Sequence, residues 1–191
     1  MHRWAYCRLT ERVDAQIGRV LDALRESGEA ERTVVIFTSD HGDMDGAHRM
    51  EHKTALYEEA CRIPLIVSQP GVTLAGRVDD AHLVSNGLDL IPTLCDYAGI
   101  EPPKELPGMS FRPLAEGRTP SMWRDVLPIE GEFGRAVVTD RYKYALYDRG
   151  EHREQLLDLA DRPLEMRNAA HDPDKQAVLA SLREAYRAHF G

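Results

Sequence analysis

The chain has 191 residues, which is enough for one domain, or for one domain with a small appendage. Its 42% hydrophobic and 29% charged residues are ordinary for a globular protein. The formal net charge of −8 argues against broad binding of nucleic acid, and no apolar stretch approaches the roughly 18 residues that would suggest a membrane span.

The N-terminal sequence and the cysteines assign the chain to no special class. The segment MHRWAYCRLTER has no apolar core of the kind that a signal peptide needs, so the compartment (cytoplasm, periplasm or outside the cell) is left open. Cys7, Cys61 and Cys95 are widely separated and form no CxxC pair, which argues against a zinc cluster and against a disulfide framework. We expect each of them to be a small buried hydrophobic residue.

Residues 10–27 are predicted to form an amphipathic helix, with Thr10 as its N-cap and Gly28 just beyond its end. Its apolar residues recur at helical spacing and are expected to pack in the core: Val13, Ile17, Val20, Leu21 and Leu24. With the following strand, this helix is predicted to form an αβ unit of a mostly parallel sheet flanked by helices, in an α/β fold.

Residues 33–38 are mostly β-branched and predict a strand buried on both faces. The strand ends in Asp40, His41 and Gly42, and in open α/β sheets ligands bind beyond such strand ends. A carboxylate and an imidazole are metal ligands, and Lys53 is a candidate anion clamp. The pattern predicts a metal-assisted site for an oxyanion such as sulfate or phosphate, and the alternative is a surface turn with a solvated lysine.

The remaining elements predict a second, smaller unit. A helix over 54–61 capped by Thr54, a strand over 63–67, a helix over 89–99 capped by Asp89 and a proline-rich connector to about residue 120 complete the first unit, residues 1–120. Strands at 136–139, 143–147 and 155–159 predict an antiparallel meander, and Asp172-Pro173 opens a final helix. Residues 121–191 are therefore predicted to form a small α+β subdomain with an antiparallel sheet and a C-terminal helix.

The sequence around the predicted site resembles one stretch of the type I sulfatases, which belong to the alkaline phosphatase superfamily. The matching residues are Asp40-His41-Gly42, His48, Lys53, Tyr57-Glu58-Glu59-Ala60 and the segment 62–67, followed in the tail by Asp158-Leu159, Pro163, Glu165 and Asn168. The resemblance implies that Asp40 and His41 bind the metal and that Lys53 contacts the sulfate. It also implies that His48 contacts the substrate or protonates the leaving oxygen.

The resemblance corresponds only to the later part of a sulfatase. The Cys- or Ser-x-Pro-x-Arg motif, whose Cys or Ser becomes the formylglycine nucleophile, is absent from this chain. We therefore expect the nucleophile and two further carboxylates in a missing N-terminal part of the same domain, and we expect the isolated chain to be inactive. A large exposed apolar patch would indicate such a missing part.

The resemblance implies a sulfate ester as substrate and a divalent metal, usually Ca²⁺ in this family. An imidazole at His41 would suit Mn²⁺ or Zn²⁺ better. Two alternatives stay open: a phosphonate or phosphodiester hydrolase of the same superfamily, and a non-catalytic chain that stands alone. The sequence does not identify the ester, the metal or the oligomeric state.

Overall fold

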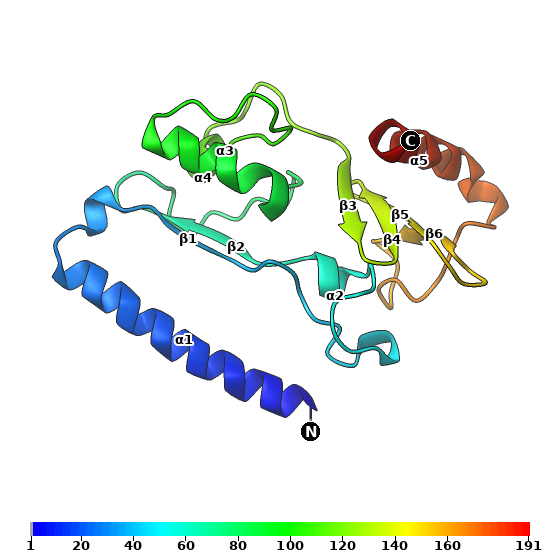
Figure 1. Ribbon diagram of the computed structural model, residues 1–191, viewed down its shortest axis with the longest axis horizontal. Coiled ribbons are helices and arrows are strands. Elements are labelled where there is room, and N and C mark those ends of the chain that lie inside the picture. The colour runs from blue at the N-terminus through cyan, green and yellow to red at the C-terminus, as the bar shows by residue number, and fades with distance from the viewer. Residues whose placement is uncertain (1) are drawn as a thin grey trace.

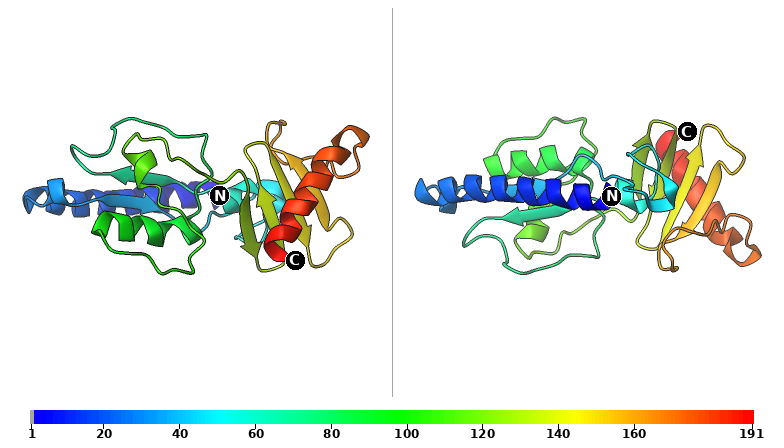
Figure 2. Two further views of the ribbon diagram at one scale, coloured as in Figure 1. Left: turned by 90° about the horizontal axis from the view of Figure 1, so that it is seen from above. Right: turned by 90° about the horizontal axis from the view of Figure 1, so that it is seen from below.

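Residues 2–191 are described by a computed structural model, and their elements form two groups along the long axis of the molecule (Figures 1 and 2). In the first group, two strands lie between one long helix and a pair of shorter helices (Figure 1). Its elements are α1 (His2–Glu26), η1 (Ala30–Arg32), β1 (Val35–Thr38), η2 (Ala47–Arg49), α2 (Glu58–Cys61), β2 (Leu65–Ser68), α3 (Asn86–Ala98) and α4 (Arg112–Ala115). The second group contains β3 (Leu127–Gly131), β4 (Gly134–Val138), β5 (Tyr142–Tyr147), β6 (Glu154–Asp158), η3 (Pro173–Lys175) and α5 (Gln176–Phe190).

The first helix begins earlier than predicted. Thr10 lies inside α1, and its hydroxyl donates to the carbonyl of Tyr6 at 3.0 Å instead of capping the helix. Gly28 follows the helix with a φ of +74°, as its predicted position requires. The predicted core packing is wrong for Val13 and Val20, which are 56% and 68% exposed, because no other described element covers that face of α1.

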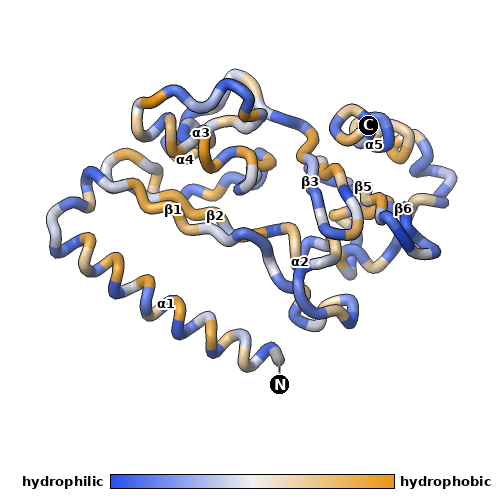
Figure 3. Tube along the Cα trace, in the orientation of Figure 1, coloured by the Kyte–Doolittle hydropathy of each residue, from blue (hydrophilic) through white to orange (hydrophobic). Residues whose placement is uncertain are grey.

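The pairing of β1 also differs from the prediction. Among residues 2–191, the one strand paired with β1 is β2, and the pair is antiparallel, with Val35 opposite Ser68. The connecting segment leaves the end of β1 and returns through α2 to the same end of the sheet, so β2 runs in the opposite direction to β1. A parallel pair would need a crossover that brings the chain back to the end of the sheet where β1 begins. Phe37 and Ile66 are 40% and 58% exposed, so this apolar sheet is not buried on both faces (Figure 3).

Helix α3 begins before the predicted cap. Ser85 is its N-cap, and the Ser85 hydroxyl accepts a hydrogen bond from the N–H of Leu88 at 3.3 Å. Asp89 is instead fully buried within the first turn, where its carboxylate binds the Arg124 guanidinium at 2.5 and 2.6 Å. Gly99, with a φ of +68°, ends the helix as predicted.

Two shorter segments differ as well. The predicted helix over 54–61 is a single turn, α2, and its N-cap is Tyr57 rather than Thr54. The proline-rich connector contains one helical turn of its own, α4. Both differences concern helices too short to show a full amphipathic period in the sequence.

The predicted antiparallel meander is confirmed, with one additional strand. The strand order is β3-β4-β5-β6, and every neighbouring pair is antiparallel. Pro128 hides β3 in the sequence, but β3 is an edge strand, where a residue without an N–H is tolerated. Helix α5 covers this sheet as predicted, and the buried core between them consists of Val137, Tyr144, Leu156, Ala169, Ala170, Leu179 and Leu182.

The cysteines occupy three different environments. Cys95 is buried as expected, Cys61 is half-buried, and Cys7 is exposed on α1, which contradicts the expectation for that residue.

Among residues 2–191, no helix combines the length and the apolar character needed to cross a membrane.

Candidate functional site

The predicted site lies in a tight turn at the end of β1. The hydroxyl of Ser39 donates to the carbonyl of His41 at 2.7 Å, and the N–H of His41 donates to Oδ1 of Asp40 at 3.0 Å. Asn86, the first residue of α3, donates its side-chain amide to the carbonyls of Ser39 and Asp40 at 2.8 and 2.9 Å. The turn is therefore fixed both by its own hydrogen bonds and by the helix that follows β2.

Gly42 brings this turn against α2. Its N–H donates to the carbonyl of Ala60 at 2.8 Å, and a Cβ at this position would lie 1.9 Å from the carbonyl oxygen of Glu59. Gly42 does not have a positive φ, so its backbone conformation is not what requires a glycine here. The requirement is space, because the backbones of the turn and of α2 approach each other too closely for any side chain.

Asp40, His41 and Lys53 are brought together. Nδ1 of His41 lies 2.7 Å from the carbonyl oxygen of Gly42, so Nδ1 carries the proton and Nε2 keeps its lone pair. Nε2 lies 3.3 Å from Oδ2 of Asp40 and 2.7 Å from Nζ of Lys53. A carboxylate oxygen, an imidazole lone pair and an ammonium group thus meet at one point on the surface.

The electrostatics of this point favour a cation. The hydrogen bond from the backbone N–H of His41 is the largest cause that lowers the pKa of Asp40 below its ordinary value, so the carboxylate is charged at neutral pH. The tautomer of His41 is also the one found in metal-binding histidines, whose second ring nitrogen donates to a carbonyl. The residues therefore fit a divalent metal, but they supply only two ligands, fewer than such an ion takes in a complete site.

His48 lies in a different cluster. Its ring stacks on that of Tyr57, with 4.0 Å between the centroids and 5° between the planes. Only 10% of the His48 side chain is exposed, and its Nε2 lies 3.8 Å from Oε2 of Glu59. Within the described part of the chain, no hydrogen bond or ion pair joins His48 to Asp40, His41 or Lys53.

A buried ion-pair group beside His48 was not predicted. Lys143 is fully buried in β5, and its Nζ lies 2.7 Å from a carboxylate oxygen of Glu58 and 2.7 Å from one of Glu165. A lysine between two tyrosines in a strand gives no indication of burial, because lysines are mostly exposed. The tail motif that includes Glu165 was the one feature of the sequence that pointed to this group, and it does not indicate that Lys143 is the partner of Glu165.

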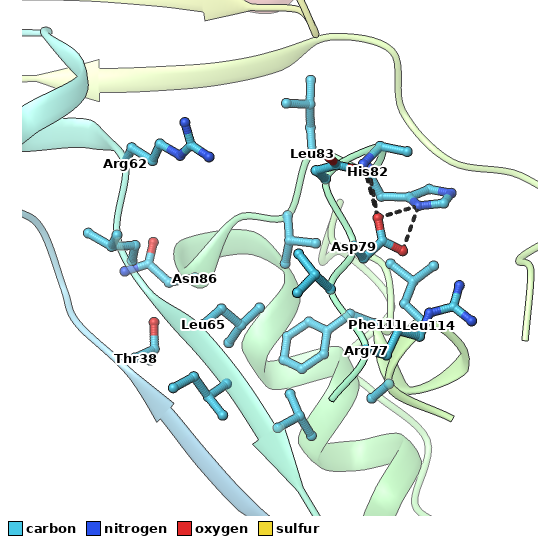
Figure 4. A pocket seen from close by; sticks show the side chains of 18 of the residues that line it. Thr38, Arg62, Leu65, Arg77, Asp79, His82, Leu83, Asn86, Phe111 and Leu114 are labelled. Atoms are coloured by element: carbon cyan, nitrogen blue, oxygen red, sulfur yellow. Dashed lines mark hydrogen bonds and ion pairs between the residues drawn. The ribbon is translucent and has the colours of Figure 1, made fainter. Parts of the chain in front are cut away.

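A cavity of about 1070 Å³ lies between the two groups of elements and not at this site. Figure 4 shows its wall, which includes Leu65, Phe111 and Leu114 together with a polar pair, Asp79 and His82, whose side chains hydrogen bond at 2.9 Å. None of Asp40, His41 and Lys53 lines it. The side chains of Asp40 and His41 are 82% and 38% exposed, so the predicted site lies on an open surface beside the end of β1.

Known proteins match most of the chain. The family model of the C-terminal region of N-sulphoglucosamine sulphohydrolase matches residues 46–189. The Delta 4,5-hexuronate-2-O-sulfatase of Bacteroides thetaiotaomicron is 35% identical over 188 residues, covering 94% of this chain and 39% of the relative. An arylsulfatase of Clostridium perfringens is 37% identical over 188 residues, covering 94% of this chain and 38% of the relative.

A solved structure agrees with these matches. The crystal structure of the phosphonate monoester hydrolase of Agrobacterium radiobacter superposes with a TM-score of 0.82 at 32% identity, covering 92% of this chain and 38% of that one. This chain therefore spans about two fifths of the length of the relatives that it matches. The chain belongs to the type I sulfatase family and corresponds to the C-terminal portion of those enzymes.

Proposed function

We propose that this chain supplies one side of the active site of a metal-dependent sulfate-ester hydrolase. The observation that carries the proposal is the convergence of Oδ2 of Asp40, Nε2 of His41 and Nζ of Lys53 at the end of β1. In this proposal Asp40 and His41 hold the metal, and Lys53 binds the sulfate group as a point charge. The sulfatases among the relatives support sulfate esters as the substrate class.

The metal, when bound, would supply a Lewis acid that polarises a sulfate oxygen. The protein residues prepare its place, since Asp40 stays ionised and the carbonyl of Gly42 holds the proton on Nδ1 of His41. Lys53 now points its ammonium at Nε2 of His41, and a cation at that point would repel it. Lys53 would then be free to neutralise the sulfate group. The metal and the Lys53 ammonium would thus each bind a different sulfate oxygen. Ca²⁺ is the family's usual ion, while the imidazole would suit Mn²⁺ or Zn²⁺ better.

The nucleophile belongs, in this proposal, to a part of the protein beyond this chain. The formylglycine motif is absent here, and the chain spans 39% and 38% of the two sulfatases named above. The exposed apolar side chains of Phe37, Ile66 and Val20 support a further part of the domain that covers the sheet and α1. The isolated chain is accordingly proposed to bind ligands weakly and to turn over no ester.

The role of His48 stays a prediction. Its ring is nine-tenths buried and stacked on Tyr57, so a contact with substrate would require the ring to leave this position. The proposal therefore rests on Asp40, His41 and Lys53 alone.

A second candidate function is hydrolysis of phosphonate monoesters or phosphodiesters. The observation that favours it is the similarity to the phosphonate monoester hydrolase, at a TM-score of 0.82 over 92% of the chain. A metal with a neighbouring lysine can polarise and neutralise a phosphoryl oxygen as well as a sulfuryl oxygen. Which ester the protein hydrolyses must therefore be measured.

The test begins with the reading frame upstream of the Met1 codon. The longest protein that this frame encodes is assayed with 4-nitrophenyl sulfate and with a 4-nitrophenyl phosphonate monoester. We expect a Cys- or Ser-x-Pro-x-Arg motif upstream, a preference for the sulfate ester, and a loss of about 100-fold in kcat/KM for Lys53→Ala. Lys104→Ala, at an exposed lysine in the connector, is the matched control and should leave turnover unchanged.

Other outcomes separate the alternatives. A preference for the phosphonate ester would favour the second function. A stop codon directly upstream, with no turnover and no metal bound at Asp40 and His41, would overturn both enzyme assignments and leave a chain that stands alone.

A further inference from the structure

A second group of potential metal ligands joins the two halves of the molecule. We call it the Glu165 cluster, and it consists of His48, Glu58, Glu59, Lys143 and Glu165. His48 belongs to η2, in the segment after β1, Glu58 and Glu59 to α2, Lys143 to β5, and Glu165 to the loop after β6. The cluster shares no residue with the site at Asp40, His41 and Lys53, and the inference below does not depend on the proposed function.

The lysine of this cluster is already fully engaged. Its Nζ contacts carboxylate oxygens of Glu58 and Glu165, both at 2.7 Å. Lys143 is thus held between two carboxylates, each within hydrogen-bond distance of its Nζ. The ammonium is therefore charged. Oε2 of Glu165 in turn accepts the backbone N–H of Glu58 at 2.6 Å, which fixes that side chain.

Negative charge in the cluster exceeds positive charge. The cluster contains three carboxylates, those of Glu58, Glu59 and Glu165, and one ammonium, that of Lys143, so these four side chains carry a net charge of −2. Excess charge away from water is costly unless a further cation is present. A divalent cation would balance this charge.

Two polar groups in the cluster lack a hydrogen bond. Oε2 of Glu59 is buried without a partner, although the rest of that side chain is 35% exposed. His48 is only 10% exposed, and its Nε2 is directed at this same oxygen from 3.8 Å, too far for a hydrogen bond. The stacked ring of Tyr57 holds the imidazole in place. A carboxylate oxygen and an imidazole nitrogen thus face each other across a gap that neither of them closes.

We infer that His48, Glu59 and Glu165 bind one divalent transition-metal ion, of the Zn²⁺ or Mn²⁺ class. Their ligand atoms all lie within 4.8 Å of one another, and metal–ligand bonds of about 2.0–2.2 Å require only a modest contraction of these side chains. One imidazole and two carboxylates match the preferences of these ions, and water can complete the coordination.

The position of the site indicates a structural role. Its three ligands come from the loop that carries Lys53, from the helix that Gly42 contacts, and from the C-terminal group of elements. A bound ion would therefore connect the loop of the candidate active site to the antiparallel sheet. Because the ion binds the folded chain and not the unfolded one, it would raise the stability of the chain.

The experiment uses the full 191-residue chain, with any affinity tag removed, after treatment with EDTA. Zn²⁺ and, separately, Mn²⁺ are titrated by calorimetry, and the melting temperature is measured with and without each ion. We expect one tight ion per chain and a rise in Tm. Co²⁺ provides a spectroscopic probe, since its visible absorption reports an imidazole and carboxylate environment.

Two variants test the ligands, and one variant is the control. Glu59→Gln and His48→Gln should each weaken binding of the tight ion by about 100-fold and abolish the rise in Tm. Asp40→Asn, which alters the other candidate site, should retain the tight ion and the full rise in Tm. Glu59→Gln removes one uncompensated charge, so the Tm of this variant without metal should equal or exceed that of the wild type. This comparison separates loss of a metal ligand from loss of folding.

Three results would overturn the inference. The first is wild-type affinity in both Glu59→Gln and His48→Gln. The second is loss of the tight ion in Asp40→Asn alone, which would place it at the other site. The third is the absence of any Tm change with either ion. Because turnover is not measured, failure here leaves the proposed hydrolase function untouched, and failure of that function leaves this site untouched.

Discussion

Nζ of Lys53 lies 2.7 Å from Nε2 of His41, on the lone pair that the imidazole would offer to a metal. The ammonium of Lys53 therefore lies where a metal cation bound to Nε2 of His41 would lie. This contact makes Lys53 a competitor of the metal as well as a candidate ligand of the substrate.

We accordingly expect Lys53→Ala to strengthen binding of Mn²⁺ at Asp40 and His41. Removal of one positive charge next to the ion should raise the affinity about fivefold. Calorimetry on the chain that also carries Glu59→Gln measures this, so that the Glu165 cluster does not contribute. A weaker affinity after removal of the lysine would contradict the arrangement, and Lys104→Ala serves as the control for general charge.

Gly42→Ala should destabilise the chain by about 1–3 kcal/mol, because its Cβ would lie 1.9 Å from the carbonyl oxygen of Glu59. The backbone must shift, and the hydrogen bond from Gly42 to Ala60 is strained or lost. Gly18→Ala is the matched control. It lies inside α1 with no atom within 4 Å of the new Cβ, so it should stabilise the chain by about 0.5–1 kcal/mol. Urea unfolding compares the two, and equal stability in both variants would argue against close packing of the turn on α2.

Lys143→Met should cost about 3–5 kcal/mol, because it leaves Glu58 and Glu165 buried without their shared cation. Urea unfolding of the metal-free chain at pH 7 measures the loss. The pKa of Lys143 is raised in the folded chain, so its contribution is fully present below the unfolded pKa of about 10.5 and is lost as pH rises through the higher folded value. A Lys143 contribution that disappears between pH 7 and pH 9 would contradict this environment.

Glu154→Gln should lower stability at neutral pH by about 1 kcal/mol or less, since the pair with Arg183 is partly exposed. The hydrogen bond from Arg183 is the largest cause of the lowered pKa of Glu154. Its stabilising contribution is therefore present above the unfolded pKa and is lost as pH falls through the folded one. Urea unfolding at pH 7 and at about pH 3 should show the difference between wild type and variant shrink in acid. A difference that grows in acid would contradict the assigned pair.

The three cysteines should react with a thiol reagent at very different rates. Cys7 is exposed on α1 and should be modified first, whereas Cys95 is buried. Burial is the main cause that raises the pKa of Cys61 to about 11, so only about one Cys61 thiol in a thousand is ionised at pH 8. Absorbance after addition of an aromatic disulfide follows the reaction. Cys7→Ser should remove the fast phase, and a fast phase that persists in this variant would contradict the burial of Cys61.

The sequence predicted the part of the site that is local in the chain. Asp40, His41 and Lys53 lie within a single loop, and the strand before them is evident from its β-branched residues. The distances show that these three side chains lie together, and their roles stay predictions. The antiparallel direction of β2 could not be predicted in this way. The pattern of apolar residues in a strand shows which face is buried, but not which strand it pairs with or in which direction.

The Glu165 cluster could not be predicted for a related reason. Its charged residues read as surface groups one by one, and only their placement between α2, β5 and the tail buries them. The exposed stripe of α1 was mispredicted because amphipathic spacing indicates that a face is apolar and not which element covers it.

The strand order β3-β4-β5-β6 follows the order of the chain, so every ladder of this sheet closes only a short loop. Such low contact order makes a sheet fast to form, and this one should fold ahead of the rest. The hydrogen bond between Glu58 and Glu165 joins residues 107 positions apart and carries a much larger loop-closure entropy. The C-terminal sheet is thus expected to fold first, and the loop of the candidate active site is expected to pack against it late in folding.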